Sequence, residues 1–136
     1  MTKSNKCVQL ILLPFFLVAF GNAHAISELE EKVSAVFLLV KSFKANNSNA
    51  PKYKIFNERI NSKCAVISAS SFCPADHTIY LEKRQLEKFY EISPVALDLI
   101  IAHEYAHAMQ SVYGFSRKYT VLNELQADCL AGVYLE

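Results

Sequence analysis

Apolar residues recur every three or four positions in three segments, which predicts three main helices. The first helix is expected over 27–44. The second opens at Ser93-Pro94, because serine favours the cap and proline fits the first turn, and it ends near Gly114. The third runs from Thr120 to the C-terminus. The positions expected to be buried are Leu29, Val33, Val36, Phe37, Val40 and Phe43, then Val95, Leu99, Ala102, Ala106 and Met109, then Leu122, Leu125, Cys129 and Val133.

Strands are expected between the first two helices. A short strand is predicted over 64–67, and 78–81 is the best β-forming run. The segment 83–90 is expected to form a short helix. The run 78–81 could be an edge strand that aligns an extended peptide or a plain structural strand, and the two roles are equally open. Without an internal repeat or a long linker, the pattern predicts one small α+β domain, mainly helical with a short β-sheet.

The first 25 residues have the pattern of a secretory signal peptide. Lys3 and Lys6 precede an apolar run over 8–20, and Ala23-His24-Ala25 supplies a small-x-small cleavage site. We expect cleavage after Ala25, which leaves 26–136 as the domain. The alternative is an uncleaved, membrane-tethering segment, and the shortness of the run argues against it. The expected protein is exported, periplasmic or secreted, with no stable membrane insertion after cleavage.

Composition narrows the class of protein further. Hydrophobic residues make up 52% and charged residues 20%, which indicates a globular chain, and a net charge of +1 gives no reason to expect a nucleic-acid partner. Cys7 lies in the predicted signal peptide. Cys64 and Cys73 could close a disulfide loop in an oxidising compartment, the alternative being two reduced thiols. Cys129 is then expected to be a buried free thiol.

The segment from His103 to His107 reads His-Glu-Tyr-Ala-His, which is the H-E-x-x-H pattern of zinc-protease helices. Residues four apart lie on one helical face, so both imidazoles can bind the same zinc ion. Glu104 is rotated by about 100° and can instead act as general base on a zinc-activated water. The alternative is a surface helix with two ordinary histidines, and the apolar stretch 99–102 argues against it.

A catalytic zinc site usually takes three protein ligands. Glu124 on the last helix is the favoured third ligand, and Asp128 could accept the second ring N–H of a ligand histidine. His77 is the alternative ligand, and a solvated acidic face is the alternative for the two acids. An oxyanion donor is not selected by the sequence, and the tyrosines that could serve are Tyr80, Tyr113 and Tyr119.

Three blocks of the chain resemble the bacterial putative neutral zinc metallopeptidase family. They are 72–81, 102–107 and 124–133, and they follow the family's order over about half of the chain. The connection from His107 to Glu124 is shorter than in the family, and the chain stops at 136 inside a predicted helix. A truncated or minimal member is therefore expected.

The resemblance implies a small zincin-like fold with an active-site helix and a following ligand helix. It also implies that His103, His107 and Glu124 hold one zinc ion per chain and that Glu104 is the catalytic acid. The sequence thus predicts an exported zinc-dependent peptidase that acts on peptide or protein substrates. The alternative is a non-catalytic, zinc-containing peptide-binding or structural module derived from a metallopeptidase. The pattern makes no prediction of the oligomeric state.

Overall fold

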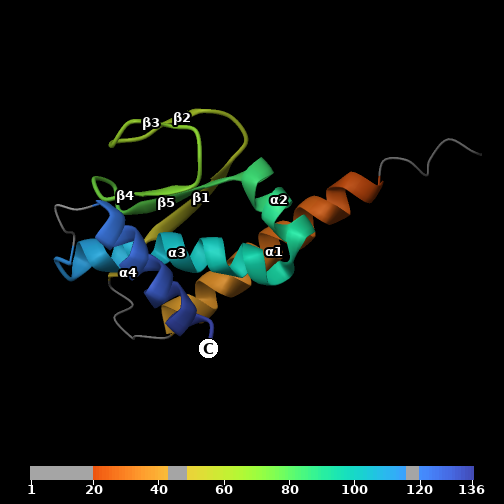
Figure 1. Ribbon diagram of the computed structural model, residues 1–136. Helices are drawn as coiled ribbons and strands as arrows, with labels where there is room; N and C mark the ends of the chain where they lie inside the picture. Colours follow the sequence, from red (N-terminus) through yellow and green to blue (C-terminus); the bar gives the residue numbers. More distant parts are fainter. Residues whose placement is uncertain (1–19, 43–48, 116–119) are drawn as a thin grey trace, which may run out of the picture.

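The computed structural model describes residues 20–42, 49–115 and 120–136, and only the backbone of 20–27. The elements in these ranges form a small mixed α+β domain (Figure 1). In chain order they are α1 (Phe20–Ser42), β1 (Lys52–Phe56), β2 (Ile60–Asn61), β3 (Val66–Ile67), β4 (Ser71–Cys73), β5 (Thr78–Glu82), α2 (Lys83–Ile92), α3 (Pro94–Val112) and α4 (Thr120–Tyr134).

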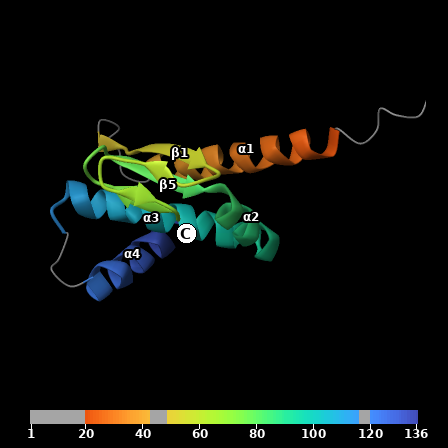
Figure 2. The ribbon, with the colours of Figure 1, turned by 90° about the horizontal axis from the view of Figure 1, so that it is seen from above.

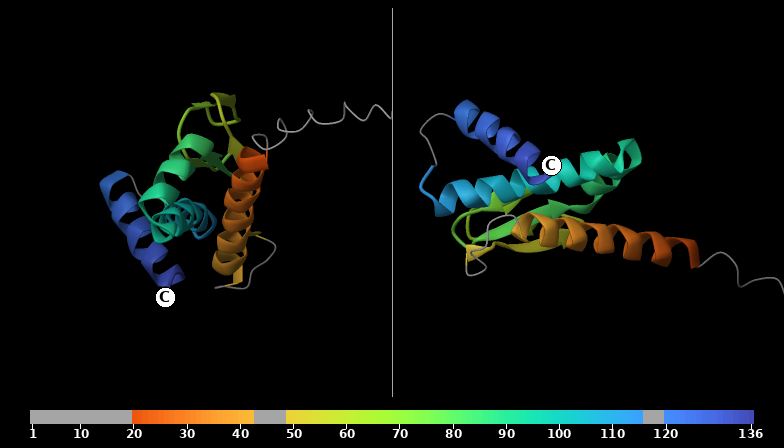
Figure 3. Two further views of the ribbon diagram at one scale, coloured as in Figure 1. Left: turned by 90° about the vertical axis from the view of Figure 1, so that its right-hand side faces the viewer. Right: turned by 90° about the horizontal axis from the view of Figure 1, so that it is seen from below.

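Helix α3 is the centre of the domain. It packs against α1, α2, α4 and the strands β4 and β5. The left view of Figure 3 looks nearly along α3, with α1 and α4 on opposite sides of it and the strands above. Leu97 and Ile101 on α3 are completely buried in the main hydrophobic core, which also includes residues of α1, β5 and α2. Side chains on α3 are therefore held in place by neighbours on several sides.

The three-stranded sheet has the order β1-β5-β4, and the view from above in Figure 2 shows it lying over α3. Strand β5 pairs in parallel with β1 and antiparallel with β4. Ile79 and Leu81 point into the helical core with no exposed surface, as the two-residue period of a strand requires. The strand predicted over 78–81 is confirmed, but the edge role considered for it is wrong, because β5 has a partner on each side. The edge strand beside α3 is β4.

The region before β5 differs from the sequence prediction. The strand expected over 64–67 is reduced to β3, which pairs with β2 in a separate two-stranded ribbon. Strand β1 had no clear pattern, since Lys52, Tyr53 and Lys54 are all exposed. It exists because its backbone completes a hydrogen-bonded ladder with β5.

Helix α1 begins at Phe20 rather than at 27, so it continues through the predicted cleavage position after Ala25. Its predicted apolar face is confirmed within the described residues, where Leu29, Val33, Val36, Phe37 and Val40 are buried. Phe43 lies outside the described residues. None of the described helices is both long and apolar enough to span a membrane.

The predicted ends of α3 are confirmed. The Ser93 hydroxyl accepts the Val95 N–H at 3.2 Å, and Gly114 follows the helix with a φ of 70°. Two predicted core positions are wrong, because Val95 is 66% exposed and Leu99 is 47% exposed. Both lie on the side of α3 that the sheet, α1 and α2 leave uncovered.

The predicted buried face of α4 is also wrong. Leu122, Leu125, Cys129 and Val133 are exposed, and the helix buries Ala127 and Ala131 instead. Successive residues are about 100° apart around a helix, so turning Glu124 and Asp128 toward α3 turns their apolar neighbours outward. The small alanine side chains let the two helices approach closely.

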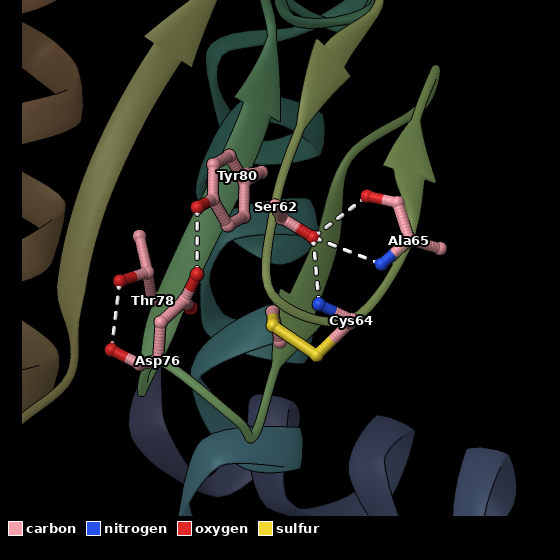
Figure 4. Close-up of a disulfide and its surroundings, with 7 residues drawn as sticks. Ser62, Cys64, Ala65, Asp76, Thr78 and Tyr80 are labelled. Carbon is pink, nitrogen blue, oxygen red and sulfur yellow. Dashed lines mark hydrogen bonds between the residues drawn. A yellow bond between two sulfur atoms is a disulfide. The ribbon is translucent and has the colours of Figure 1, made fainter.

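A disulfide joins Cys64 to Cys73 (Figure 4). Cys73 ends β4 and is buried in a small second core with Phe56, Ile67 and Tyr80. The loop on the other side is organised by Ser62, whose hydroxyl donates to the Ala65 carbonyl at 2.8 Å. The disulfide therefore fastens the β2–β3 ribbon to the edge strand β4.

We expect the double substitution Cys64→Ala/Cys73→Ala to lower the free energy of unfolding by about 2–3 kcal/mol. The bridged residues are 9 apart, and a loop of that size removes this much chain entropy from the unfolded state. Urea unfolding of the variant and of oxidised wild-type protein measures the difference. Reduced wild-type protein, which keeps both side chains, should lose the same amount, and equal stability of reduced and oxidised protein would contradict the expectation.

Candidate metal centre and active-site cleft

Helix α3 presents His103 and His107 on its face toward α4. They are one turn apart, and their ring centroids are 4.7 Å from each other. The two Nε2 atoms approach to 3.1 Å. The side chains are 19% and 21% exposed, so they are accessible yet held by their surroundings.

Helix α4 brings Glu124 to the same point. Its Oε2 atom lies 3.2 Å from His103 Nε2 and 3.3 Å from His107 Nε2. The side chain is half exposed. One ligand atom from each of the three residues thus lies within 4.8 Å of the other two, close enough to surround one metal ion.

The outer nitrogens of both histidines are engaged as well. His103 Nδ1 lies 2.8 Å from Asp128 Oδ1, and His107 Nδ1 lies 2.9 Å from Gln110 Oε1. A carboxylate and an amide oxygen both accept hydrogen bonds, so each Nδ1 carries the proton and donates. In the neutral rings, each Nε2 then has a free lone pair directed at the cluster.

The donor set fits a zinc ion. In the neutral tautomers, two imidazole lone pairs and a carboxylate oxygen converge with no hydrogen-bond donor among them, and a metal cation between them would remove their mutual repulsion. Bonds of about 2.0–2.1 Å in a tetrahedron put neighbouring ligand atoms about 3.3 Å apart. The observed separations of 3.1, 3.2 and 3.3 Å match that spacing.

Glu104 lies next to this cluster and is only 6% exposed. The pKa of its carboxyl is raised to about 7, chiefly by burial and also by the negative charge of Glu124. The charge of His107 and a backbone hydrogen bond from Phe72 act in the opposite direction. A carboxylate whose pKa lies near neutrality is well suited to take up and release a proton.

We expect Glu104→Gln to stabilise the metal-free protein above pH 7 by up to about 3 kcal/mol. The folded protein keeps the Glu104 proton up to a pKa of about 7, whereas the unfolded chain loses it near 4.5. Wild-type stability therefore falls as the pH rises between these two values, and the glutamine variant does not share this loss. Denaturant unfolding with a zinc chelator at pH 5 and pH 8 measures the effect. A stability difference of equal size at both pH values would contradict it.

An open cleft of about 510 Å³ lies over the cluster. Its walls come from α3, α4 and the edge strand β4 with one residue on either side of it. Two hydrogen bonds hold the loop that precedes β4 in place. The Ser70 N–H donates to Gln85 Oε1 at 2.9 Å, and the Ser70 hydroxyl accepts the Glu82 N–H at 3.0 Å. The lining residues are Ser70, Ser71, Phe72, Pro74, His103, Glu104, His107, Gln110, Ser111, Asn123 and Glu124.

The other predicted candidates in the described part of the chain do not belong to this cluster. His77 is in the turn before β5, where its Nε2 donates to the Asn49 carbonyl at 2.8 Å, and it is not part of the three-residue cluster. The alternative of His77 as third ligand is therefore wrong for this arrangement. Tyr80 is buried, and its hydroxyl donates to Asp76 at 2.8 Å (Figure 4). Tyr113 lines a separate apolar hollow, and Tyr119 lies outside the described residues.

One residue of the centre was missed by the sequence analysis. Gln110 is 3% exposed and is the hydrogen-bond partner of His107. Its position three residues after His107 puts it on the same face of α3, so helical spacing alone could have indicated it.

A family model described as "Putative neutral zinc metallopeptidase" matches residues 30–136, which include every residue of the centre. The chain belongs to this family. It is also similar to the uncharacterized proteins Mb2605 of Mycobacterium bovis and Rv2575 of Mycobacterium tuberculosis, with 27% identity over 106 residues in each case. These matches cover 62% of this chain and 35% of each relative, so the chain spans about a third of the length of the relatives it matches. No solved structure matches it.

Proposed function

We propose that this member of the zinc metallopeptidase family is an exported peptidase that binds one zinc ion and hydrolyses peptide bonds. The observation that carries the proposal is the convergence of His103, His107 and Glu124 beside the buried carboxyl of Glu104, at the floor of an open cleft. Three ligands of this kind next to a base form the donor set of catalytic zinc sites.

In the proposed reaction, His103, His107 and Glu124 hold the metal and Asp128 holds the ring of His103. A bound zinc ion supplies Lewis-acid polarisation of water and of the scissile carbonyl. Glu104 takes a proton from the attacking water and delivers it to the leaving amine. Burial of this carboxyl raises its pKa in the metal-free protein, which favours proton uptake by Glu104.

Strand β4 is the proposed docking edge for the substrate. Among the described residues it pairs only with β5, and Ser71 and Phe72 line the cleft. An extended peptide can add to such an edge as a further strand, which would run across the metal centre.

Two features favour catalysis over the alternative of a non-catalytic zinc module. A structural zinc site is usually closed by four protein ligands, whereas three converge here and the cleft leaves room for a substrate. A structural site also has no need of a buried carboxyl such as Glu104 beside the metal. Residues 1–25 and the Cys64–Cys73 disulfide support the proposed export to the periplasm or medium, since both are typical of exported proteins.

Digestion of an unstructured protein such as reduced casein tests the proposal. The mature protein should cleave it, a zinc chelator should stop cleavage, and added zinc should restore it. A chain that retains zinc yet cleaves neither casein nor a broad peptide library would overturn the peptidase proposal in favour of the binding module.

A further inference from the structure

We propose that Gln110 is a positioning residue that fixes the tautomer of His107 and couples it to the helix that carries Glu124. The inference deepens the proposed function, because it concerns the residues that would hold the zinc ion. Gln110 is one of the two buried polar or charged residues in the described part of the chain, the other being Glu104. A neutral amide in such a place needs partners for its oxygen and both its N–H groups.

The orientation of the Gln110 amide follows from its partners. Its Nε2 lies 2.8 Å from the backbone carbonyl of Asn123, which can only accept. The NH₂ group must therefore face Asn123, and its second N–H meets Gln126 Oε1 at 3.2 Å. The amide oxygen is left facing His107 Nδ1 at 2.9 Å.

This orientation determines the state of His107. An amide oxygen cannot donate, so the proton of the neutral ring has to be on Nδ1, and Nε2 is left with its lone pair toward Glu124. A rotated Gln110 amide would direct its NH₂ group at His107 and favour the opposite tautomer, with the proton at the metal position. The Asn123 carbonyl prevents that rotation, because it would then face the amide oxygen.

The same amide links the two helices. Asn123 directly precedes Glu124, so the bond from Gln110 holds the α4 backbone next to the ligand carboxylate. His103 is held in a different way, by Asp128, whose side chain is 66% exposed and belongs to α4. The charged, solvent-exposed carboxylate of Asp128 orients His103. The buried, neutral amide of Gln110 orients His107 and also sets the distance of Glu124 from that ring.

Nitrogen-15 NMR of the metal-free protein tests the tautomer directly. In the neutral ring, measured at alkaline pH, His107 of the wild type should carry its proton on Nδ1. Gln110→Met, which has similar volume but no amide, should give a mixture of tautomers. It should also weaken zinc binding about 10- to 100-fold in competition with a chelator.

Two further variants separate orientation from packing. Gln110→Glu keeps an acceptor for His107 but loses both donors, so it should keep the tautomer and weaken zinc binding. Glu91→Met, at an exposed position of α2 that does not line the cleft, should change neither. A wild-type ring protonated on Nε2, or a Gln110→Met protein with unchanged tautomer and zinc affinity, would overturn the proposal. The tautomer is measured in the metal-free protein. A wild type that binds no zinc would therefore refute the proposed function, and the NMR result would still decide whether Gln110 fixes the tautomer of His107.

Discussion

Replacing Glu104 by glutamine is expected to lower kcat for peptide cleavage at least 100-fold while zinc remains bound. General-base catalysis by a positioned side chain contributes roughly 10²–10⁴-fold, and an amide cannot take up the proton. Glu104 is buried and is not one of the three clustered ligand residues, so the change keeps its shape and leaves the donor set intact. The measurement is kcat on an unstructured protein substrate together with zinc content.

Glu91→Gln is the matched control for this substitution. Glu91 lies exposed on α2 and does not line the cleft, so the same chemical change there should leave kcat unaltered. A Glu104→Gln protein that cleaves substrate at the wild-type rate would remove Glu104 from the proposed mechanism. Loss of zinc in that variant would instead place Glu104 among the groups that hold the metal.

Replacing Glu124 by alanine should weaken zinc binding more than 100-fold. The substitution removes one of three converging ligand atoms and the only negative charge among them. Asp128→Ala removes a contact to the outer nitrogen of His103 and should cost about 10- to 100-fold, the range for groups that orient a ligand. Competition with a chromophoric chelator measures both affinities.

Glu124→Ala should weaken zinc binding more than Asp128→Ala does, and this order distinguishes a metal ligand from a residue that orients one. Glu91→Ala again serves as the control and should bind zinc as the wild type does. An equal or larger loss for Asp128→Ala than for Glu124→Ala would mean that the two acids have exchanged roles. Wild-type affinity in Glu124→Ala would require another third ligand.

Sequence periodicity predicted the elements that bury a continuous apolar face. The buried face of α1 was found in this way, because burial imposes the period on the sequence. The limits of α3 were found from its capping residues, and the central strand β5 from its run of β-forming residues. Strand β1 and the exposed face of α4 could not be found, since neither follows that rule. Strand β1 depends on backbone pairing with β5. The apolar side chains of α4 are exposed because Glu124 and Asp128 occupy the side of the helix that faces α3.

The candidate site was more predictable than the fold around it. His103 and His107 are four residues apart on one helix, so their proximity follows from helix geometry. Glu124 and Asp128 were expected to share a face, but which histidine each contacts depends on how α4 crosses α3, and that is a tertiary property. Gln110 was overlooked because an amide carries no charge or metal-binding signature, although its spacing from His107 was visible.

Zinc content of the purified mature protein tests the central claim most directly. Metal analysis after gentle purification should give one zinc ion per chain, and the same analysis of His103→Ala/His107→Ala should give almost none. Wild-type protein that contains no zinc and takes up none when it is supplied would contradict the account of the metal centre and of the peptidase activity built on it.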